Sequence, residues 1–284
     1  MSWETALDRQ IHDYLPDLKW AADEPMAKHT SFRIGGPAKR MAFPKTREQL
    51  VVLMGFLQDA GVKPLLIGNG TNLLVADKGL DTVVIDTSAE LSHIELTDEG
   101  EIAADAGVSL AKLALFAWKN GLTGLEFAHG IPGTVGGAVY MNAGAYGGEM
   151  KDVVTSCRYV GGDGEIHEMS AAEMQLTYRH SVFSGSSMVI TSVTMELVPG
   201  DKHLNLEDLR HLPNPNKSLR RIEKPQPMKL NILDEKESKH VQASGWVLCS
   251  RAHRGVRSEG IHHRRSAGQR KAQRFCYQPR PRYV

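Results

Sequence analysis

The sequence predicts an α+β fold for residues 1–200, followed by a segment of different character. Short apolar strands alternate with helical segments, without the regular βαβ repeat of a doubly wound sheet. Two Gly-rich stretches, at residues 68–72 and 130–148, interrupt this pattern. After Pro199 the apolar periodicity fades, and Pro and Arg residues scatter without order. We therefore expect one folded unit up to about residue 200 and an aberrant tail beyond it.

Helices are predicted where apolar residues recur at helical spacing between capping residues. The predicted helices are residues 4–17, 45–61 and 109–120, with a weaker signal at 204–212. Thr46 and Ser109 are suited to cap the second and third helices, because their hydroxyls accept hydrogen bonds from free backbone N–H groups. Pro16 should end the first helix, because proline cannot continue the backbone hydrogen bonds.

Strands are predicted from short apolar or alternating runs between turn residues. The predicted strands are residues 64–67, 73–76, 82–86, 153–160, 164–168 and 187–198. Residues 90–106 alternate as a β-hairpin would, with its turn at residues 98–100. This mixture of separate strands and helices favours the α+β class.

Composition excludes several classes of protein. The chain contains no run of about 18 apolar residues, so we expect no membrane span. Its N-terminus lacks a basic region followed by an apolar stretch, so we expect no secretory signal. Three cysteines, Cys157, Cys249 and Cys276, show no metal-ligand spacing, so no metal site is predicted. Reduced thiols fit a cytoplasmic protein, which we expect to be a monomer.

The formal net charge of +1 conceals two oppositely charged parts. Residues 1–200 hold 15 Lys and Arg against 25 Asp and Glu, whereas residues 201–284 hold 19 against 8. A basic tail of this kind is one signature of nucleic-acid binding. The tail lacks interleaved aromatic residues and any nucleic-acid motif, so we expect no nucleic-acid partner.

The first candidate binding segment is a turn between two apolar strands. It comprises Gly68, Asn69, Gly70, Thr71 and Asn72. Glycines allow a close backbone approach, and successive N–H groups in such a turn can bind an anion. The segment lacks the G-x-G-x-x-G spacing of a Rossmann fold and the lysine of a P-loop. A hairpin-like turn without a ligand is the alternative.

The second candidate binding segment is Gly-rich but interleaved with apolar residues. Its candidate residues are Ile131, Pro132, Gly133, Thr134, Gly136, Gly137, Ala138, Asn142 and Gly144. Small apolar residues suit close contact with a large flat cofactor and its pyrophosphate. Two such loops, about sixty residues apart, could hold a dinucleotide between them without lysines. A packing turn is the alternative interpretation.

A third motif, Tyr178-Arg179-His180, precedes the last predicted strand. An arginine flanked by aromatic residues could clamp a carboxylate with two parallel hydrogen bonds. A surface arginine with no special role is the alternative, and we regard His180 as incidental.

Four motifs stand together in one order. They are HTSFRIGGPA (29–38), GNGTNLLVADKG (68–79), GLEFAHGIPGTVGGAVYMNAGAYGGE (124–149) and YRHSVF (178–183). In this order they resemble the UDP-N-acetylenolpyruvoylglucosamine reductase family over residues 20–200. The resemblance implies an FAD-binding fold of the vanillyl-alcohol-oxidase type. It divides the chain into an N-terminal helical segment, residues 1–22, and an FAD-binding domain, residues 23–200, with subdomains of about 23–86 and 87–200.

The resemblance also implies a reaction. NADPH reduces FAD, and the flavin passes hydride to the enolpyruvyl double bond of a UDP-sugar, giving UDP-N-acetylmuramate for peptidoglycan synthesis. The 68–72 turn and the 131–138 loop should hold the pyrophosphate and isoalloxazine of FAD. Tyr178 and Arg179 should contact the substrate, and Arg179 should stabilise the negative charge that develops on its carboxylate.

Residues 201–284 replace the family's substrate-binding domain with an aberrant basic tail. The family's proton-donor serine and late glutamate motifs do not occur there. The alternative function is therefore a catalytically inactive FAD-binding remnant. A third possibility is a different FAD oxidase or dehydrogenase of the same fold. The lack of a His or Cys suited to covalent flavin attachment near the 131–138 loop argues mildly against it. His129 is adjacent to that loop, so this alternative stays open.

A shift of the reading frame would explain the tail. With allowed codons, residues 239–284 read one nucleotide later can encode the family's F-K-R-P, I-G-G-A-Q-V-S and G-F-V-I-N segments in the expected order. Gly-Trp-Val at 245–247 then yields the required glycine, and residues 275–279 permit F-V-I-N. We hypothesise a one-base insertion or deletion upstream of about residue 239.

Overall fold

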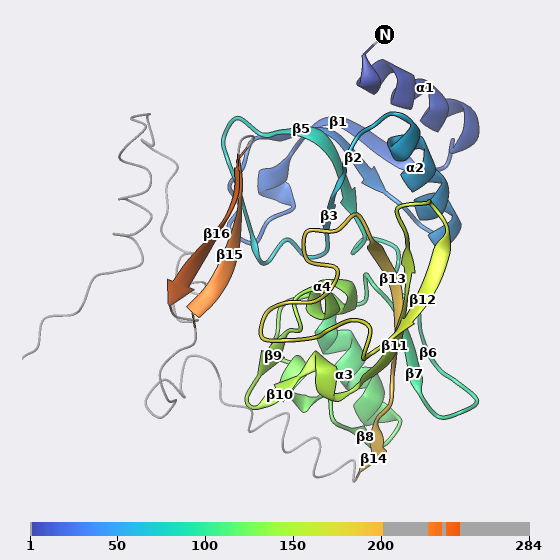
Figure 1. Ribbon diagram of the computed structural model, residues 1–284, viewed down its shortest axis with the longest axis vertical. Helices are drawn as coiled ribbons and strands as arrows, with labels where there is room; N and C mark the ends of the chain where they lie inside the picture. Colours follow the sequence, from blue (N-terminus) through green and yellow to red (C-terminus); the bar gives the residue numbers. More distant parts are fainter. Residues whose placement is uncertain (1, 201–226, 235–236, 245–284) are drawn as a thin grey trace, which may run out of the picture.

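The computed structural model describes residues 2–200, 227–234 and 237–244 (Figure 1). Its first sheet holds four strands in the order β1-β2-β5-β3. These strands are β1 (Lys19–Pro25), β2 (Pro37–Phe43), β3 (Leu65–Ile67) and β5 (Leu80–Asp86). β1 pairs antiparallel with β2, whereas β5 runs parallel to both β2 and β3. The parallel strands bring the carboxyl ends of β3 and β5 to one edge of the sheet.

The second sheet is antiparallel, with the order β12-β11-β13-β7-β6. Its strands are β6 (Ile94–Leu96), β7 (Ile102–Asp105), β11 (Val154–Val160), β12 (Ile166–Ser170) and β13 (Val189–Met195). The two sheets fall on either side of residue 87, and β1 spans the predicted boundary at residue 22. The domain boundaries suggested by the sequence stay predictions.

Four pairings in three smaller sheets complete the described strands. They join β4 (Leu73–Val75) to β15 (Pro227–Asp234), β15 to β16 (Glu237–Ser244), β8 (Leu122–Thr123) to β14 (Val198–Pro199), and β9 (Gly144–Ala145) to β10 (Gly148–Glu149). β4 and β15 run parallel, and the hairpin of β15 and β16 lies beside the first sheet in Figure 1.

Four α-helices and three short 3₁₀ helices lie in the described part of the chain. The α-helices are α1 (Trp3–Tyr14), α2 (Arg47–Asp59), α3 (Leu110–Lys119) and α4 (Val135–Tyr140). The 3₁₀ helices are η1 (Met26–Lys28), η2 (Glu126–Ala128) and η3 (Met150–Asp152). Each α-helix begins with an N-cap residue whose hydroxyl accepts a hydrogen bond from a backbone N–H of the first turn. The four caps are Ser2, Thr46, Ser109 and Thr134. None of the described helices is long and apolar enough to cross a membrane.

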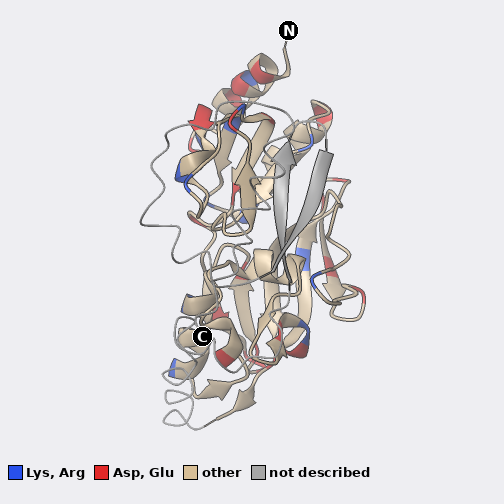
Figure 2. Ribbon diagram, turned by 90° about the vertical axis from the view of Figure 1, so that its left-hand side faces the viewer, with Lys and Arg blue, Asp and Glu red and all other residues tan. Residues whose placement is uncertain are grey.

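The helices cover the sheets through continuous apolar clusters. One cluster joins α1 and α2 to the first sheet and reaches two residues of the second; it includes Leu7, Ile11, Leu50, Leu53, Val83, Ile85, Val160 and Val189. A larger apolar cluster packs α3 and α4 against the second sheet, and Figure 1 shows both helices beside its strands β11 and β13. Figure 2 shows acidic and basic residues interspersed over the helices and loops around these interiors.

Most predicted elements are confirmed. The helices predicted at 45–61 and 109–120 form with the expected caps, and the hairpin predicted at 90–106 forms from β6 and β7. The hairpin-like interpretation of the 68–72 turn is wrong, because β3 pairs with β5 and β4 pairs with β15. The sequence did not predict β1, β2 or α4 as elements. The helix predicted at 204–212 lies outside the described residues.

A partly buried ion pair connects α2 to the second sheet. Both Nε and Nη2 of Arg47 donate to Asp105 Oδ1, at 3.0 and 2.5 Å. The other oxygen, Asp105 Oδ2, accepts the backbone N–H of His93 at 3.0 Å. Asp105 is buried, and a buried charge is tolerated only where its partners satisfy it. This carboxylate therefore fixes the end of β7 relative to α2.

Asp8 fastens α1 to the hairpin of β1 and β2. Its two oxygens accept hydrogen bonds from Arg40 Nη2 at 2.6 Å and Arg40 Nε at 2.7 Å. Trp20 Nε1 donates to the same carboxylate at 2.7 Å. The hydrogen bonds from Arg40 are the main reason that the pKa of Asp8 lies below its usual value.

We predict that Asp8→Ala lowers the free energy of unfolding by about 1–2 kcal/mol at neutral pH, because it removes charged hydrogen bonds at a half-exposed site. A lowered pKa in the folded state gives stability that is present above the unfolded pKa of about 3.9 and is lost as pH falls through the folded value. Chemical denaturation of both proteins between pH 7 and pH 3 should therefore show the difference shrinking with acid. Asp17→Ala, at an exposed carboxylate, is the control. A difference that does not change with pH would contradict this account.

Candidate functional site

The two Gly-rich segments lie in direct contact. A Cβ atom added at Gly68 would stand 2.3 Å from Thr134 Oγ1 and 2.9 Å from Thr134 Cγ2. No side chain fits there without a shift of one loop. The first loop, residues 68–72, and the second loop, residues 131–138, are thus held at the separation that glycine permits.

The first loop also packs against the segment that follows η1. Gly70 has a φ of +59°, and a Cβ added there would lie 1.9 Å from the carbonyl oxygen of His29. The Ser31 N–H donates to the Gly70 carbonyl at 3.1 Å. The early HTSFR motif therefore forms one side of the first loop, although the sequence analysis assigned it no site residue.

The second loop is anchored to the end of β7. The N–H groups of Val135 and Gly136 donate to the carbonyls of Val108 and Ala106, both at 2.8 Å. A Cβ added at Gly136 would lie 2.7 Å from Ala106 Cβ, so this anchoring too requires glycine. Thr134 caps α4 by accepting the Gly137 N–H at 3.4 Å. The start of α4 is therefore fixed by β7 and faces the first loop.

A hollow of about 480 Å³ opens beside the first loop. It is lined by Lys28, His29, Thr30, Ser31, Arg33, Gly68, Asn69, Asp86 and Ser88. Ile67 and Asp86 are register partners at the ends of β3 and β5, so the hollow lies at the carboxyl ends of parallel strands. Lys28 and Arg33 line the hollow, and their positive charges suit an anionic group there.

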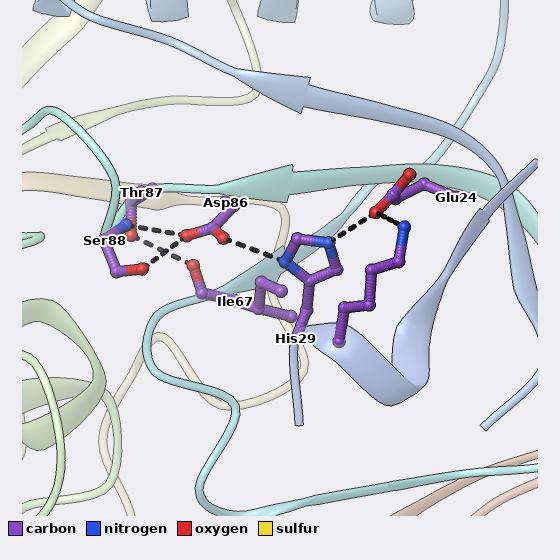
Figure 3. Close-up of polar contacts among 7 residues, drawn as sticks. Glu24, His29, Ile67, Asp86, Thr87 and Ser88 are labelled. Carbon is purple, nitrogen blue, oxygen red and sulfur yellow. Dashed lines mark hydrogen bonds and ion pairs between the residues drawn. The ribbon is translucent and has the colours of Figure 1, made fainter. Parts of the chain in front are cut away.

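Two carboxylates hold His29 at the wall of the hollow (Figure 3). His29 Nε2 lies 3.1 Å from Glu24 Oε1, and Nδ1 lies 3.6 Å from Asp86 Oδ2. The hydrogen bonds that the Glu24 carboxylate accepts, chiefly from His29 and also from Lys28, lower its pKa. Asp86 Oδ1 accepts hydrogen bonds from the backbone and the hydroxyl of Ser88 at 2.9 and 2.6 Å. Side-chain contacts within the protein therefore fix the positions of His29 and Asp86 at the wall of the hollow.

Asn72 leaves one buried polar atom without a partner. Its Nδ2 lies 3.9 Å from the sulfur of Met141, a weak contact that links the first loop to the end of α4. Its Oδ1 is buried and accepts no hydrogen bond from the described residues. Unsatisfied buried acceptors are rare in folded proteins and are often completed by a ligand or a water molecule.

Arg179 lies against the chain that continues from the second loop. Its Nη1 donates to the Asn142 carbonyl at 3.3 Å, and its Nη2 donates to the Gly144 carbonyl at 2.9 Å. Its guanidinium carbon stands 5.6 Å from the ring centre of the exposed Tyr178. Arg179 has a φ of +52°, a conformation that costs energy for this residue type and occurs often at functional sites.

The contacts between loops bring the predicted site residues together. Gly68 meets Thr134, Asn72 meets Met141, and Arg179 meets Asn142 and Gly144. Five residues that line the hollow were not predicted as site residues: Lys28, His29, Arg33, Asp86 and Ser88. His29 and Arg33 stood in a quoted motif, whereas Asp86 had only its place at the end of a predicted strand. In the part of the chain that the structure describes, no group of three His, Cys, Asp or Glu side chains could hold a metal ion.

Known proteins resemble this chain in sequence and in fold. Residues 38–170 match the FAD binding domain family. The UDP-N-acetylenolpyruvoylglucosamine reductase of Syntrophomonas wolfei is 42% identical over 188 residues, which are 66% of this chain and 62% of that protein. The enzyme of the same name from Clostridioides difficile is 43% identical over 185 residues, which are 65% of this chain and 60% of that protein. The chain thus spans less than two-thirds of the length of these relatives.

Solved structures share the fold. The UDP-N-acetylenolpyruvylglucosamine reductase of Thermus caldophilus superposes with a TM-score of 0.57 at 24% identity, covering 84% of this chain and 95% of that one. Cholesterol oxidase from Brevibacterium sterolicum superposes with a TM-score of 0.51 at 19% identity, covering 65% of this chain and 38% of that one. The predicted FAD-binding fold is confirmed by the family match and by the fold that these two structures share with the chain.

We predict that Gly68→Ala separates the two loops, because its Cβ would collide with Thr134. The expected results are a lower melting temperature, by several degrees for a loss of 1–3 kcal/mol, and weaker FAD binding. Both can be followed by thermal denaturation and by the quenching of flavin fluorescence.

Gly55→Ala is the matched control, because a Cβ at Gly55 meets nothing within 4 Å in the middle of α2. It should be neutral or stabilise by about 0.5–1 kcal/mol, since alanine has the higher helix propensity. Thr134→Ala removes the colliding Oγ1 and Cγ2, so it should partly rescue Gly68→Ala despite its own cost of about 1 kcal/mol as a lost cap. Purely additive losses in the double variant would count against a collision between the loops.

Proposed function

About two-thirds of this chain is homologous to the UDP-N-acetylenolpyruvoylglucosamine reductases, and we propose that it performs the reduction that their name states. The substrate is then UDP-N-acetylenolpyruvoylglucosamine, the product UDP-N-acetylmuramate, the cofactor FAD and the reductant NADPH. The single observation that carries the proposal is the contact of the two Gly-rich loops in a chain of this homology. A cytoplasmic location and a monomeric state stay predictions.

The residues of the site fit FAD. Gly68 lines the hollow and is partly exposed, whereas Gly70 is buried against His29; neither carries a side chain, which suits close approach of the loop backbone to a pyrophosphate. The hollow beside them carries Lys28 and Arg33, whose charges favour phosphate groups. The unpartnered Asn72 Oδ1 supplies an acceptor for a donor on the cofactor. When bound, FAD supplies hydride transfer between the nicotinamide and the substrate double bond.

Arg179 is suited to bind the carboxylate of the substrate. Its guanidinium is permanently charged and lies beside the exposed Tyr178 ring, at the side of the second loop. Hydride addition to an enolpyruvyl group places negative charge on the carbon next to that carboxylate. A fixed cation beside the carboxylate stabilises this charge without reorganising during the reaction. Arg179 would thus both orient the substrate and lower the barrier.

The second candidate function is an FAD-binding remnant without turnover. Its basis is the sequence of residues 201–284, which lacks the serine and glutamate motifs that the resemblance requires. We propose that residues 1–22 and 23–200 form the helical segment and the FAD-binding domain. We further propose that residues 201–284 replace a substrate-binding domain through a shift of the reading frame.

We predict that the full chain, reconstituted with FAD, shows a bound-flavin absorbance band and oxidises NADPH only when the enolpyruvyl UDP-sugar is present. Absorbance at 340 nm follows the oxidation, and mass spectrometry identifies the product. A flavin band without turnover supports the remnant instead. Failure to bind flavin at all would sink both candidates.

We predict that the nucleotide sequence encoding residues 195–245 contains a one-base insertion or deletion relative to a frame that continues the family pattern. A chain expressed from the restored frame should turn over the substrate faster than the present chain, because it regains the proton donor and the glutamate. Resequencing of this region is the measurement. An intact frame, together with detection of the present chain in cells, would refute the shift.

A further inference from the structure

We propose that Asn142 is a positioning residue that holds Arg179 in place through its buried side-chain amide. The importance of this role for catalysis rests on the proposed function, whereas the positioning itself does not. Asn142 is 1% exposed, and two other segments of the chain, one with Glu149 and Lys151 and one with Thr177, converge on its amide. The sequence analysis grouped Asn142 with the cofactor-binding residues, but its contacts support this different task.

The amide is fully engaged as a donor. Asn142 Nδ2 donates to Glu149 Oε2 at 2.7 Å and to the Thr177 carbonyl at 3.0 Å. Its Oδ1 accepts the Lys151 N–H at 3.0 Å. An asparagine amide has two N–H donors, and both are used within the protein. A cofactor would have to displace one of these partners to receive a hydrogen bond from Asn142.

The bond to Thr177 fixes the backbone on which Arg179 stands. Thr177 and His180 exchange backbone hydrogen bonds at 3.0 and 3.2 Å, which closes a tight turn around Arg179. Arg179 has its positive φ within this turn. Because non-Gly residues avoid that conformation, the turn needs contacts from outside to keep it. The Asn142 amide supplies one of them.

The guanidinium group of Arg179 contacts the segment that contains Asn142. Its guanidinium donates to the carbonyls of Asn142 and Gly144. Asn142 therefore holds Arg179 at both ends, at the turn through its side chain and at the guanidinium through its backbone. Asn142 has a φ of +42°, which asparagine tolerates better than most residues. This combination of a left-handed backbone and a two-donor amide explains the residue type.

Neighbouring charges reinforce the arrangement. Burial alone would raise the pKa of Glu149, but hydrogen bonds from Lys151 and Asn142 and the charge of Arg179 together lower it. Lys151 Nζ lies 3.1 Å from Glu149 Oε2. The Glu149 carboxylate is thus charged at neutral pH and is retained as a partner of Asn142 and Lys151. Arg179 keeps its donors for carbonyls on one side and for a ligand carboxylate on the other.

The test is the chemical accessibility of Arg179 in the full chain carrying Asn142→Gly. Glycine keeps the positive φ and deletes only the amide, so the variant separates side-chain loss from backbone strain. Phenylglyoxal modifies free guanidinium groups, and peptide mass spectrometry gives the rate at each arginine. We expect the rate at Arg179 to rise about fivefold, as the loss of one net hydrogen bond predicts. This readout needs neither bound flavin nor turnover.

Two controls make the result specific. Arg158, on β11, reports general loosening in the same sample and should not change. Asn120→Gly removes another amide, which bonds Phe116 at the end of α3, and should leave the Arg179 rate as in the parent chain. An unchanged rate at Arg179 in Asn142→Gly, or equal rises at Arg158 and Arg179, would overturn the proposal.

If the chain turns over its substrate, Asn142→Gly should also lower kcat while the KM for NADPH stays constant, because the nicotinamide does not need Arg179. A parallel rise in that KM would indicate damage to the whole site and would contradict a positioning role. Loss of the proposed reductase function would leave the phenylglyoxal result standing, so the two hypotheses fail separately.

Discussion

The close contact between Gly68 and Thr134 is the constraint on which the candidate site depends. It joins the loop that follows β3 of the first sheet to the loop that is hydrogen-bonded to the residues after β7 of the second sheet, and it exists only because residue 68 has no side chain. Thr134 serves twice, as the neighbour of Gly68 and as the N-cap of α4. Any group held between the loops is therefore positioned by both sheets at once. A cofactor that must present one reactive face to a substrate needs this rigidity.

Polar contacts connect the two loops to the surrounding helices and strands. Arg47 and Asp105 couple α2 to β7, and backbone bonds from the end of β7 hold the start of α4. On the other side, the His29 segment braces the first loop and forms the wall of the hollow. The walls of the candidate site are thus held by contacts within the protein itself. Pre-organisation of this kind lowers the entropy lost on binding.

The homology and the fold support different parts of the functional argument. The two solved structures share the architecture at identities below 25%, so they bear on the fold alone. The sequence relatives carry the proposed chemistry, yet the chain spans about 60% of their length. The residues proposed to bind the cofactor consequently all lie in the part of the chain that the structure describes. The substrate half rests mainly on Arg179 and Tyr178, because residues 201–226 and 245–284 lie outside the described range.

The sequence by itself determined the features that depend on neighbouring residues. Thr46 and Ser109 cap their helices, the β6–β7 hairpin closes within a few residues, and the glycines mark the loops, since capping, turns and positive φ are local properties. β1 was not predicted because the exposure of its residues does not alternate along the strand. α4 was not predicted because it contains two glycines, which disfavour a helix, and only its packing in the folded protein stabilises it. Only the tertiary structure could decide which distant residues meet. His29 meets Asp86, and Asn142 meets Thr177, because sheet pairing and loop packing bring together segments whose sequences carry no sign of each other.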